Sequence, residues 1–150
     1  MEKIRPMKKR DLKYCAMILE QAYSKEPYSE TFQPGSALKY IESRFRIGKD
    51  HSFVLEESGK IKGFVMSSIS YWTTGPQAIV EEIAVSEDSL RRGYATRLNN
   101  YLEEHFKSLG VRVAMLWTKK NSPAYKFHRN NNYTEARDVA VMFKLFDKKL

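Results

Sequence analysis

Residues 79–97 read IVEEIAVSEDSLRRGYATR, and this stretch decides the fold. The apolar run over residues 79–85 predicts a strand, and the residues after Gly93 have the apolar period of a helix. A basic turn with one glycine, residues 91–96, joins the two. A strand that leads through such a turn into a helix presents backbone N–H groups to a phosphate. The alternative, an ordinary turn with a solvated basic corner, stays open from this segment alone.

Length and composition predict one globular domain over residues 1–150, because 42% of the residues are hydrophobic and 13% are aromatic. Cys15 is the single cysteine, so no internal disulfide and no cysteine-rich zinc site can form. The charged N-terminus, MEKIRPMKKRDLKY, is not followed by the apolar core of a signal peptide. No apolar run approaches the roughly 20 residues that span a membrane. These features predict a soluble cytoplasmic protein with no membrane partner.

The formal net charge is +8 and the isoelectric point is about 9.5, which favours anionic partners such as phosphorylated cofactors, acidic substrates or nucleic acid. The basic clusters at residues 8–10, 119–120 and 148–149 are short, so each is better interpreted as solvated surface. The three histidines are scattered and show no paired spacing, so we expect no metal site.

Hydrophobic periodicity predicts seven strands and four helices along the chain. The order corresponds to an α/β or α+β domain with a mixed sheet of about six to seven strands. The expected strands cover residues 4–7, 51–56, 61–71, 79–85, 111–117 and two within 133–146, and the expected helices cover residues 12–22, 38–48, 94–109 and 123–130.

Several phosphate-binding and hydrolytic motifs are missing from the sequence. There is no GxxxxGK[ST] of a P-loop, no GxGxxG of a dinucleotide fold, no HExxH and no GxSxG elbow. The glycine turn at Gly93 is what remains. It has the pattern x-x-x-Gly-x-Ala, in which Leu90 opens the block and Ala95 closes it.

A second block lies about thirty residues further on, at the start and end of the short helix over residues 123–130. It contains Asn121, Ala124, His128 and then Asn132-Tyr133. Together with the element order, the two blocks resemble the GNAT superfamily, the acetyl-CoA-dependent N-acetyltransferases, over nearly the whole chain. Three positions depart from its signatures: Leu90 replaces Gln or Arg, His128 replaces Tyr, and Asn132 replaces Gly.

The resemblance implies a sheet that is splayed between the strands at residues 79–85 and 111–117. The pantetheine arm of acetyl-CoA would lie in that gap, and its diphosphate would rest on amides of the basic turn. Asn121 would contact the pantetheine or orient the helix after it. The implied cofactor-binding residues are Ile83, Ala84, Val85, Arg91, Arg92, Gly93, Tyr94, Ala95, Thr96, Asn121 and Tyr125.

The implied chemistry is direct attack of a primary amine on a thioester, which needs a general base because such an amine is almost fully protonated at neutral pH. Glu81 and Glu82 are the candidates. Strand alternation places them on opposite faces unless a bulge intervenes. Glu81 has the parity of Ile83 and Val85 and is therefore preferred, with Glu82 in reserve. The alternative is that one faces solvent and the other pairs with a cation.

The departing thiolate needs a proton, and His128 occupies the position at which the superfamily usually has tyrosine. Imidazole can donate a proton, but it is partly deprotonated at pH 7. Tyr125 and Tyr133 are alternative donors. A helix-surface histidine without a catalytic role is the competing interpretation of His128. The Val85 N–H is the implied oxyanion donor.

The leading hypothesis is therefore an acetyl-CoA-dependent N-acetyltransferase that acts on a protein N-terminus, a lysine or a small-molecule amine. The alternatives are a non-catalytic acyl-CoA-binding regulatory module and a basic nucleic-acid or ribosome-associated protein, the latter disfavoured because no RNA-binding motif is present. The final strands could pair between subunits in a homodimer or complete the sheet of one chain.

Overall fold

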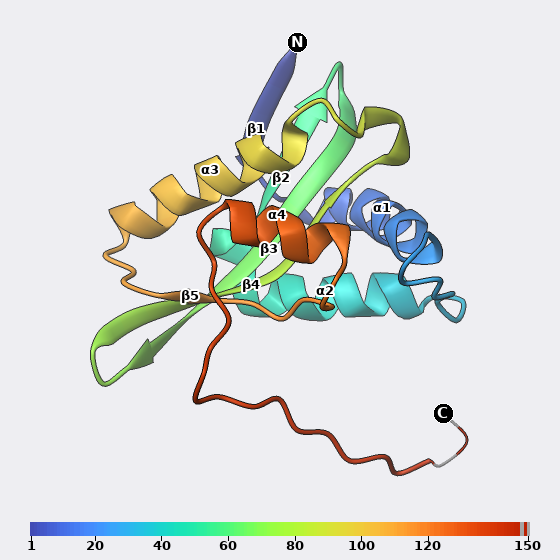
Figure 1. The fold of residues 1–150 in the computed structure, drawn as a ribbon. Helices are drawn as coiled ribbons and strands as arrows, with labels where there is room; N and C mark the ends of the chain where they lie inside the picture. The colour runs from blue at the N-terminus through green and yellow to red at the C-terminus, as the bar shows by residue number, and fades with distance from the viewer. Residues whose placement is uncertain (148, 150) are drawn as a thin grey trace. The chain divides into compact units, whose positions relative to one another are not determined.

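The computed structural model describes residues 1–147 and 149 (Figure 1). The strands are β1 (Glu2–Pro6), β2 (Phe53–Glu57), β3 (Lys60–Trp72), β4 (Gly75–Val85) and β5 (Ala114–Met115), and the helices are α1 (Leu12–Ser24), α2 (Ser36–Gly48), α3 (Tyr94–Ser108) and α4 (Pro123–Asn130). The chain divides into two compact units, Met1–Trp117 and Thr118–Leu150.

The first unit contains a five-stranded mixed sheet in the order β1-β2-β3-β4-β5. The pairs from β1 to β4 are antiparallel, and β4 pairs with β5 in parallel. The mixed α/β fold class predicted from the sequence is therefore confirmed. The helices predicted over residues 38–48 and 123–130 are also present as α2, which ends at Gly48, and α4, which begins at Pro123.

The predicted strand count was too high. The strand expected over residues 111–117 is reduced to two paired residues, because β5 pairs with β4 only at Ala78–Ala114 and Ile79–Met115. The two strands expected within residues 133–146 are absent from the described part of the chain. Alternating apolar residues define only the faces of a strand, and a strand forms only where another strand accepts its backbone hydrogen bonds.

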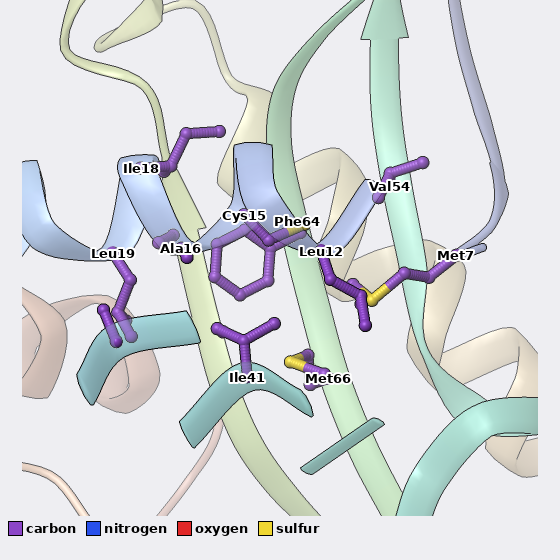
Figure 2. Close-up of a cluster of buried hydrophobic side chains, with 12 residues drawn as sticks. Met7, Leu12, Cys15, Ala16, Ile18, Leu19, Ile41, Val54, Phe64 and Met66 are labelled. Carbon is purple, nitrogen blue, oxygen red and sulfur yellow. The ribbon is translucent and has the colours of Figure 1, made fainter. Parts of the chain in front are cut away.

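Helices α1 and α2 cover one face of the sheet. Their apolar side chains pack with alternate residues of the central strands, among them Val54 of β2 and Phe64 and Met66 of β3. Figure 2 shows this cluster, in which the Phe64 ring lies among side chains of α1 and α2. Cys15 is fully buried there, and burial raises the pKa of its thiol far above the ordinary range. It is therefore a core residue, not a nucleophile.

Helix α3 covers the opposite face. Tyr94, Leu98, Leu102 and Phe106 pack against residues of β2, β3 and β4 that point away from α1 and α2. Near its C-terminal end, the Nε2 atom of His105 lies 2.9 Å from Nδ1 of His51, which belongs to the short 3₁₀ turn that follows α2. This contact joins α3 to the start of β2, so the helix has polar as well as apolar anchors.

The second unit contains α4. Ser122 is its N-cap, since the Ser122 side chain accepts a hydrogen bond from the Tyr125 N–H at 3.0 Å, and Pro123 begins the helix. Asn132 follows the helix with a positive φ of 68°, a conformation that asparagine tolerates better than most residues. Among the described residues, no helix is both long enough and apolar enough to cross a membrane.

Candidate active site

A β-bulge in β4 determines where its two adjacent glutamates point. The register with β3 shifts between Met66, which pairs with Glu82, and Ser67, which pairs with Val80, so Glu81 is the extra residue. Ala78 and Val80 pack on the α3 side, whereas Ala84 packs on the α1 and α2 side. Even-numbered residues of β4 therefore face α3 before the bulge and face α1 and α2 after it. Glu82 is the first of them to face α1 and α2.

Glu82 lies in a half-buried position between two tyrosine hydroxyls. Tyr40 of α2 donates to its Oε1 atom at 2.9 Å, and Tyr23 of α1 lies 3.4 Å from the same atom. Burial raises the pKa of the Glu82 carboxyl to about 7; the two tyrosine hydrogen bonds oppose this rise, and the charge of Glu81 adds to it. The carboxyl can therefore exchange a proton near neutral pH.

Glu81 has a different environment, although it also reaches α2. Ser68 donates to its Oε1 atom at 3.1 Å, and the Arg44 guanidinium lies 3.4 Å from Oε2. Arg44 in turn lies over the Tyr40 ring, 5.7 Å from its centroid. The bulge therefore brings both carboxylates to one side of the sheet, and Glu81 is the one that pairs with a cation.

The C-terminal half of β4 has backbone groups with no neighbouring strand. Ser86 donates to the Lys62 carbonyl at 2.8 Å, so Lys62 and Ser86 form a hydrogen-bonded pair of the antiparallel ladder. Hydrogen-bonded and non-hydrogen-bonded pairs alternate along such a ladder, so Gly63–Val85 and Val65–Ile83 are non-hydrogen-bonded pairs. The N–H and C=O groups of Ile83 and Val85 consequently point away from β3. Pairing with β5 ends at Ile79, so in the described chain no strand accepts these groups.

The basic turn leads into α3 with the geometry of an anion site. Gly93 is the N-cap, with φ 76°, and it offers no side-chain cap to the first N–H groups of the helix. A Cβ atom at Gly93 would meet nothing within 4 Å, so the glycine is needed for its left-handed conformation and for access, not for packing space. Arg91 also has a positive φ, 63°, and is exposed.

Arg92 is already paired with carboxylates. Its guanidinium lies 2.6 Å from Glu57 and 3.3 Å from Glu2, and it stacks over the Tyr94 ring at 4.7 Å. Arg97 pairs with Glu2 as well, and the Tyr94 hydroxyl donates to Glu2 at 2.9 Å. This network fixes the first turn of α3 against β1 and β2. The Tyr94 side chain is buried, so only its backbone is available to a ligand.

The second unit holds the remaining predicted site residues. Asn121 has a positive φ, 62°, just before the Ser122 cap. The Tyr125 hydroxyl donates to Glu135 at 2.9 Å. His128 is buried between the rings of Phe127 and Tyr133, at 5.3 and 5.5 Å, and its Nδ1 atom has no hydrogen-bond partner among the described residues. Burial lowers the pKa of His128, so its imidazole is mainly neutral at pH 7.

Comparison with known proteins decides the family. Residues 17–133 match the model of the acetyltransferase (GNAT) family. The chain belongs to this family. GNAT proteins are acyltransferases that use acetyl-CoA, and the resemblance predicted from the glycine turn and the Asn121 block is thereby confirmed. No curated protein sequence gives a significant match to the chain.

Solved structures share this GNAT fold over almost the full length. A possible acetyltransferase from Clostridium difficile 630 has a TM-score of 0.83 at 16% identity, covering 98% of this chain and 99% of that one. Glucosamine-6-phosphate N-acetyltransferase from Arabidopsis thaliana has a TM-score of 0.68 at 18% identity, covering 98% and 99%. Aminoglycoside N-acetyltransferase AAC(6′)-Iy in complex with CoA has a TM-score of 0.69 at 24% identity, covering 96% and 95%. At these identities the likeness concerns the fold.

Tyr40 and Arg44 belong to the candidate site of this GNAT chain, and sequence analysis missed them. They are four residues apart on α2, beside the apolar stripe of Leu38, Ile41 and Phe45 that identified the helix. Polar residues at such spacing lie next to one another on the helix surface, and here they reach adjacent partners, Glu82 for Tyr40 and Glu81 for Arg44. Their spacing could therefore have indicated a polar cluster at the edge of the core, although nothing in it names Glu81 or Glu82.

A pocket of about 940 Å³ lies on another part of the first unit and contains none of the predicted site residues. Its walls come from α1, the β2–β3 hairpin and the turn after β4, and they mix both charges, with Arg5 paired to Asp11 and Lys62 paired to Asp88. Within the described residues, no group of three or more His, Cys, Asp or Glu side chains could hold a metal ion.

Proposed function

We propose that this GNAT protein transfers an acetyl group from acetyl-CoA to a primary amine, with Glu82 as the general base. The observation that carries the proposal is the Glu82 carboxyl, whose pKa is raised to about 7 on the same strand as the unpaired backbone groups of Ile83 and Val85. A base with a pKa near the working pH accepts a proton efficiently. Its environment supports Glu82 over Glu81, which is paired with Arg44.

The residues of the basic turn fit a diphosphate. Backbone N–H groups of Tyr94, Ala95 and Thr96 begin α3 behind a glycine with no side-chain cap, which is the arrangement that binds phosphate oxygens. Arg91 would add charge, whereas Arg92 would hold the turn in place through Glu57 and Glu2. Bound acetyl-CoA would supply the acetyl group as a thioester.

The pantetheine arm would take its hydrogen bonds from the free edge of β4. Ile83 and Val85 are the suitable residues, because the backbone of Ala84 faces β3. The Val85 N–H would also stabilise negative charge on the carbonyl oxygen during the reaction. Asn121 and Tyr125 remain proposals as cofactor contacts, with Asn121 positioned by its left-handed backbone before α4.

The acceptor would be an amine that is protonated, and therefore cationic, before it reacts. Two adjacent carboxylates, Glu81 and Glu82, lie on the α1 and α2 side, together with Tyr23 and Tyr40. Carboxylates and aromatic faces both attract an ammonium group. Glu82 would then take the proton that the amine must lose before it attacks. The charges of Glu81 and Arg44 would neutralise each other.

His128 would hold the proton for the leaving sulfur, and its substitution has a predictable pH signature. Because burial lowers the pKa of His128, little imidazolium is present at pH 7, so His128→Phe should lower kcat only about 10-fold. The ratio of wild-type to variant rates should shrink as pH rises. His128→Tyr should exceed His128→Phe at pH above about 8, since a phenol keeps its proton to about pH 10. A ratio that does not change with pH would remove His128 from this role.

Calorimetry with acetyl-CoA tests the proposed cofactor, and thiol release with a panel of primary amines then tests the reaction. We expect a micromolar dissociation constant for acetyl-CoA, binding of dephospho-CoA, which keeps the diphosphate, and no binding of free adenosine, which lacks it. Binding of acetyl-CoA without release of the CoA thiol in the presence of any amine of the panel would support the non-catalytic acyl-CoA-binding module instead. Lack of acetyl-CoA binding would contradict the proposed function.

A further inference from the structure

The pocket of about 940 Å³ between α1, the β2–β3 hairpin and the turn after β4 has walls that carry charges of both signs. Each carboxylate of these walls is already in an ion pair. The pairs are Arg5–Asp11, Arg5–Glu56, Lys62–Asp88 and Lys25–Glu87, at 2.8, 2.6, 2.7 and 3.1 Å. The negative charges of the walls are therefore balanced within the protein.

Three cations of the same walls have no such balance. Arg10, Lys13 and Lys60 are exposed, and none of them forms an ion pair in the described part of the chain. They come from three places in the sequence, the 3₁₀ turn before α1, the first turn of α1 and the start of β3. Like charges gathered around one hollow repel one another, so an anion that lies between them is favoured.

Tyr14 gives the pocket an aromatic surface beside these cations. It is 47% exposed, and its hydroxyl forms no hydrogen bond within residues 1–147 and 149. The Lys13 ammonium lies 5.0 Å from the centroid of the Tyr14 ring, so a free cation and the ring are neighbours. Ile61, which packs on the core, adds apolar surface to the wall. A planar ring that carries an anionic group would meet both features.

We propose that this pocket binds a nucleoside monophosphate, separately from the candidate active site. Its phosphate, with about 1.5 to 2 negative charges at pH 7, would accept hydrogen bonds from Arg10, Lys13 and Lys60. Its base would stack on Tyr14. The volume of about 940 Å³ lies within the range of small-molecule sites, roughly 300–1,000 Å³. A nucleic-acid strand, with one charge per phosphate along a line, would fit a basic stripe better than cations around one pocket.

Calorimetry with the four ribonucleoside monophosphates tests the proposal on the full chain, at low salt where exposed charges are least screened. At least one of them should bind with a dissociation constant of about 100 μM or lower. The triple variant Arg10→Gln/Lys13→Gln/Lys60→Gln should weaken that binding at least about 10-fold, because the phosphate loses its charged donors.

A second triple variant controls for net charge. Lys39→Gln/Arg46→Gln/Lys49→Gln removes the same charge from exposed positions on α2 and just after it, and none of these residues lines the pocket. It should bind the nucleotide as the wild type does.

Tyr14 variants test the base contact. Tyr14→Ala should weaken the nucleotide roughly 10-fold and leave the binding of ribose 5-phosphate unchanged, since that molecule has no base to stack. Tyr14→Phe keeps the ring and should bind the nucleotide as the wild type does.

Gly93→Asp locates the binding, because residues 91–96 do not line the pocket and this variant alters only the turn before α3. It should bind the nucleotide as the wild type does. Four results would overturn the proposal: no binding of any monophosphate, unchanged binding by the Arg10/Lys13/Lys60 variant or by Tyr14→Ala, loss of binding in Gly93→Asp, or binding of a single-stranded hexanucleotide more than about 10-fold tighter than that of every monophosphate. The last result would mean a nucleic-acid surface.

Discussion

Replacing Glu82 by glutamine should lower kcat by roughly 100- to 1,000-fold and remove a pH dependence near neutrality. A base works only when deprotonated, so the Glu82 carboxyl, with a pKa of about 7, should make kcat/KM fall below pH 7 in the wild type. Deprotonation of the amine substrate adds a second pH dependence to the rate at higher pH. The measurement is a pH–rate profile at saturating acetyl-CoA, in which the variant should lack the break near pH 7.

Two neighbouring variants make this test sharper, because each should shift the break in a known direction. The charge of Glu81 raises the pKa of Glu82, so Glu81→Gln should move the break below pH 7 with a small loss of rate. The Tyr40 hydrogen bond lowers the same pKa, so Tyr40→Phe should move the break above pH 7. If Glu81→Gln abolishes the break and Glu82→Gln keeps it, Glu81 is the base.

Stability distinguishes loss of chemistry from loss of folding in Glu82→Gln. A carboxyl whose folded pKa exceeds its unfolded pKa adds stability below pH 4.5 and loses it as pH rises through about 7. Above that pH, the wild type carries the cost of a half-buried charge that the variant lacks. Glu82→Gln should therefore be at least as stable as the wild type at pH 8, as measured by thermal unfolding.

The second large effect should come from Gly93→Asp, which we expect to raise the dissociation constant of acetyl-CoA by roughly 100-fold, or about 2.7 kcal/mol. The new carboxylate would accept the first N–H groups of α3 and would repel the diphosphate proposed to bind them. The left-handed backbone, φ 76°, adds a strain that any side chain at this position carries.

Gly35→Asp is a matched control for that strain and that charge. Gly35 is the N-cap of α2, its φ is 79°, and a Cβ atom there would also meet nothing within 4 Å. The two variants should lose similar stability, but Gly35→Asp should bind acetyl-CoA as the wild type does. Equal dissociation constants for Gly93→Asp and the wild type would exclude the turn as the diphosphate site. Calorimetry with acetyl-CoA measures all three proteins.

Much of the fold could be predicted from the sequence because its signals are local. The apolar stripe of α1, the termination of α2 at Gly48 and the glycine turn before α3 all depend on residues close together in the chain. The extent of β5 could not be predicted in this way. The length of β5 depends on how far it stays within hydrogen-bonding distance of β4, which the pattern of residues 111–117 does not encode.

The site was less accessible from the sequence because its contacts are distant. Arg92 is paired with Glu2 and Glu57, which lie 90 and 35 residues away in the chain, and no local pattern announces those partners. The same is true of Tyr40 and Glu82, at a separation of 42 residues. The sequence identified the pair of glutamates, but their different environments depend on the bulge, which only the pairing with β3 reveals, and on the contacts of Glu82 with Tyr40 and of Glu81 with Arg44.

The bulge also gives β4 one residue more than the stretch of β3 that it faces. Without Glu81, Val80 and Glu82 would be neighbours and would keep their partners Ser67 and Met66, so β4 would alternate regularly and its later residues would keep their faces. Glu81 is thus an added carboxylate beside Arg44 and Ser68. Deleting it should remove one of the two carboxylates, while Ala84 stays in the core and Glu82 stays between its tyrosines.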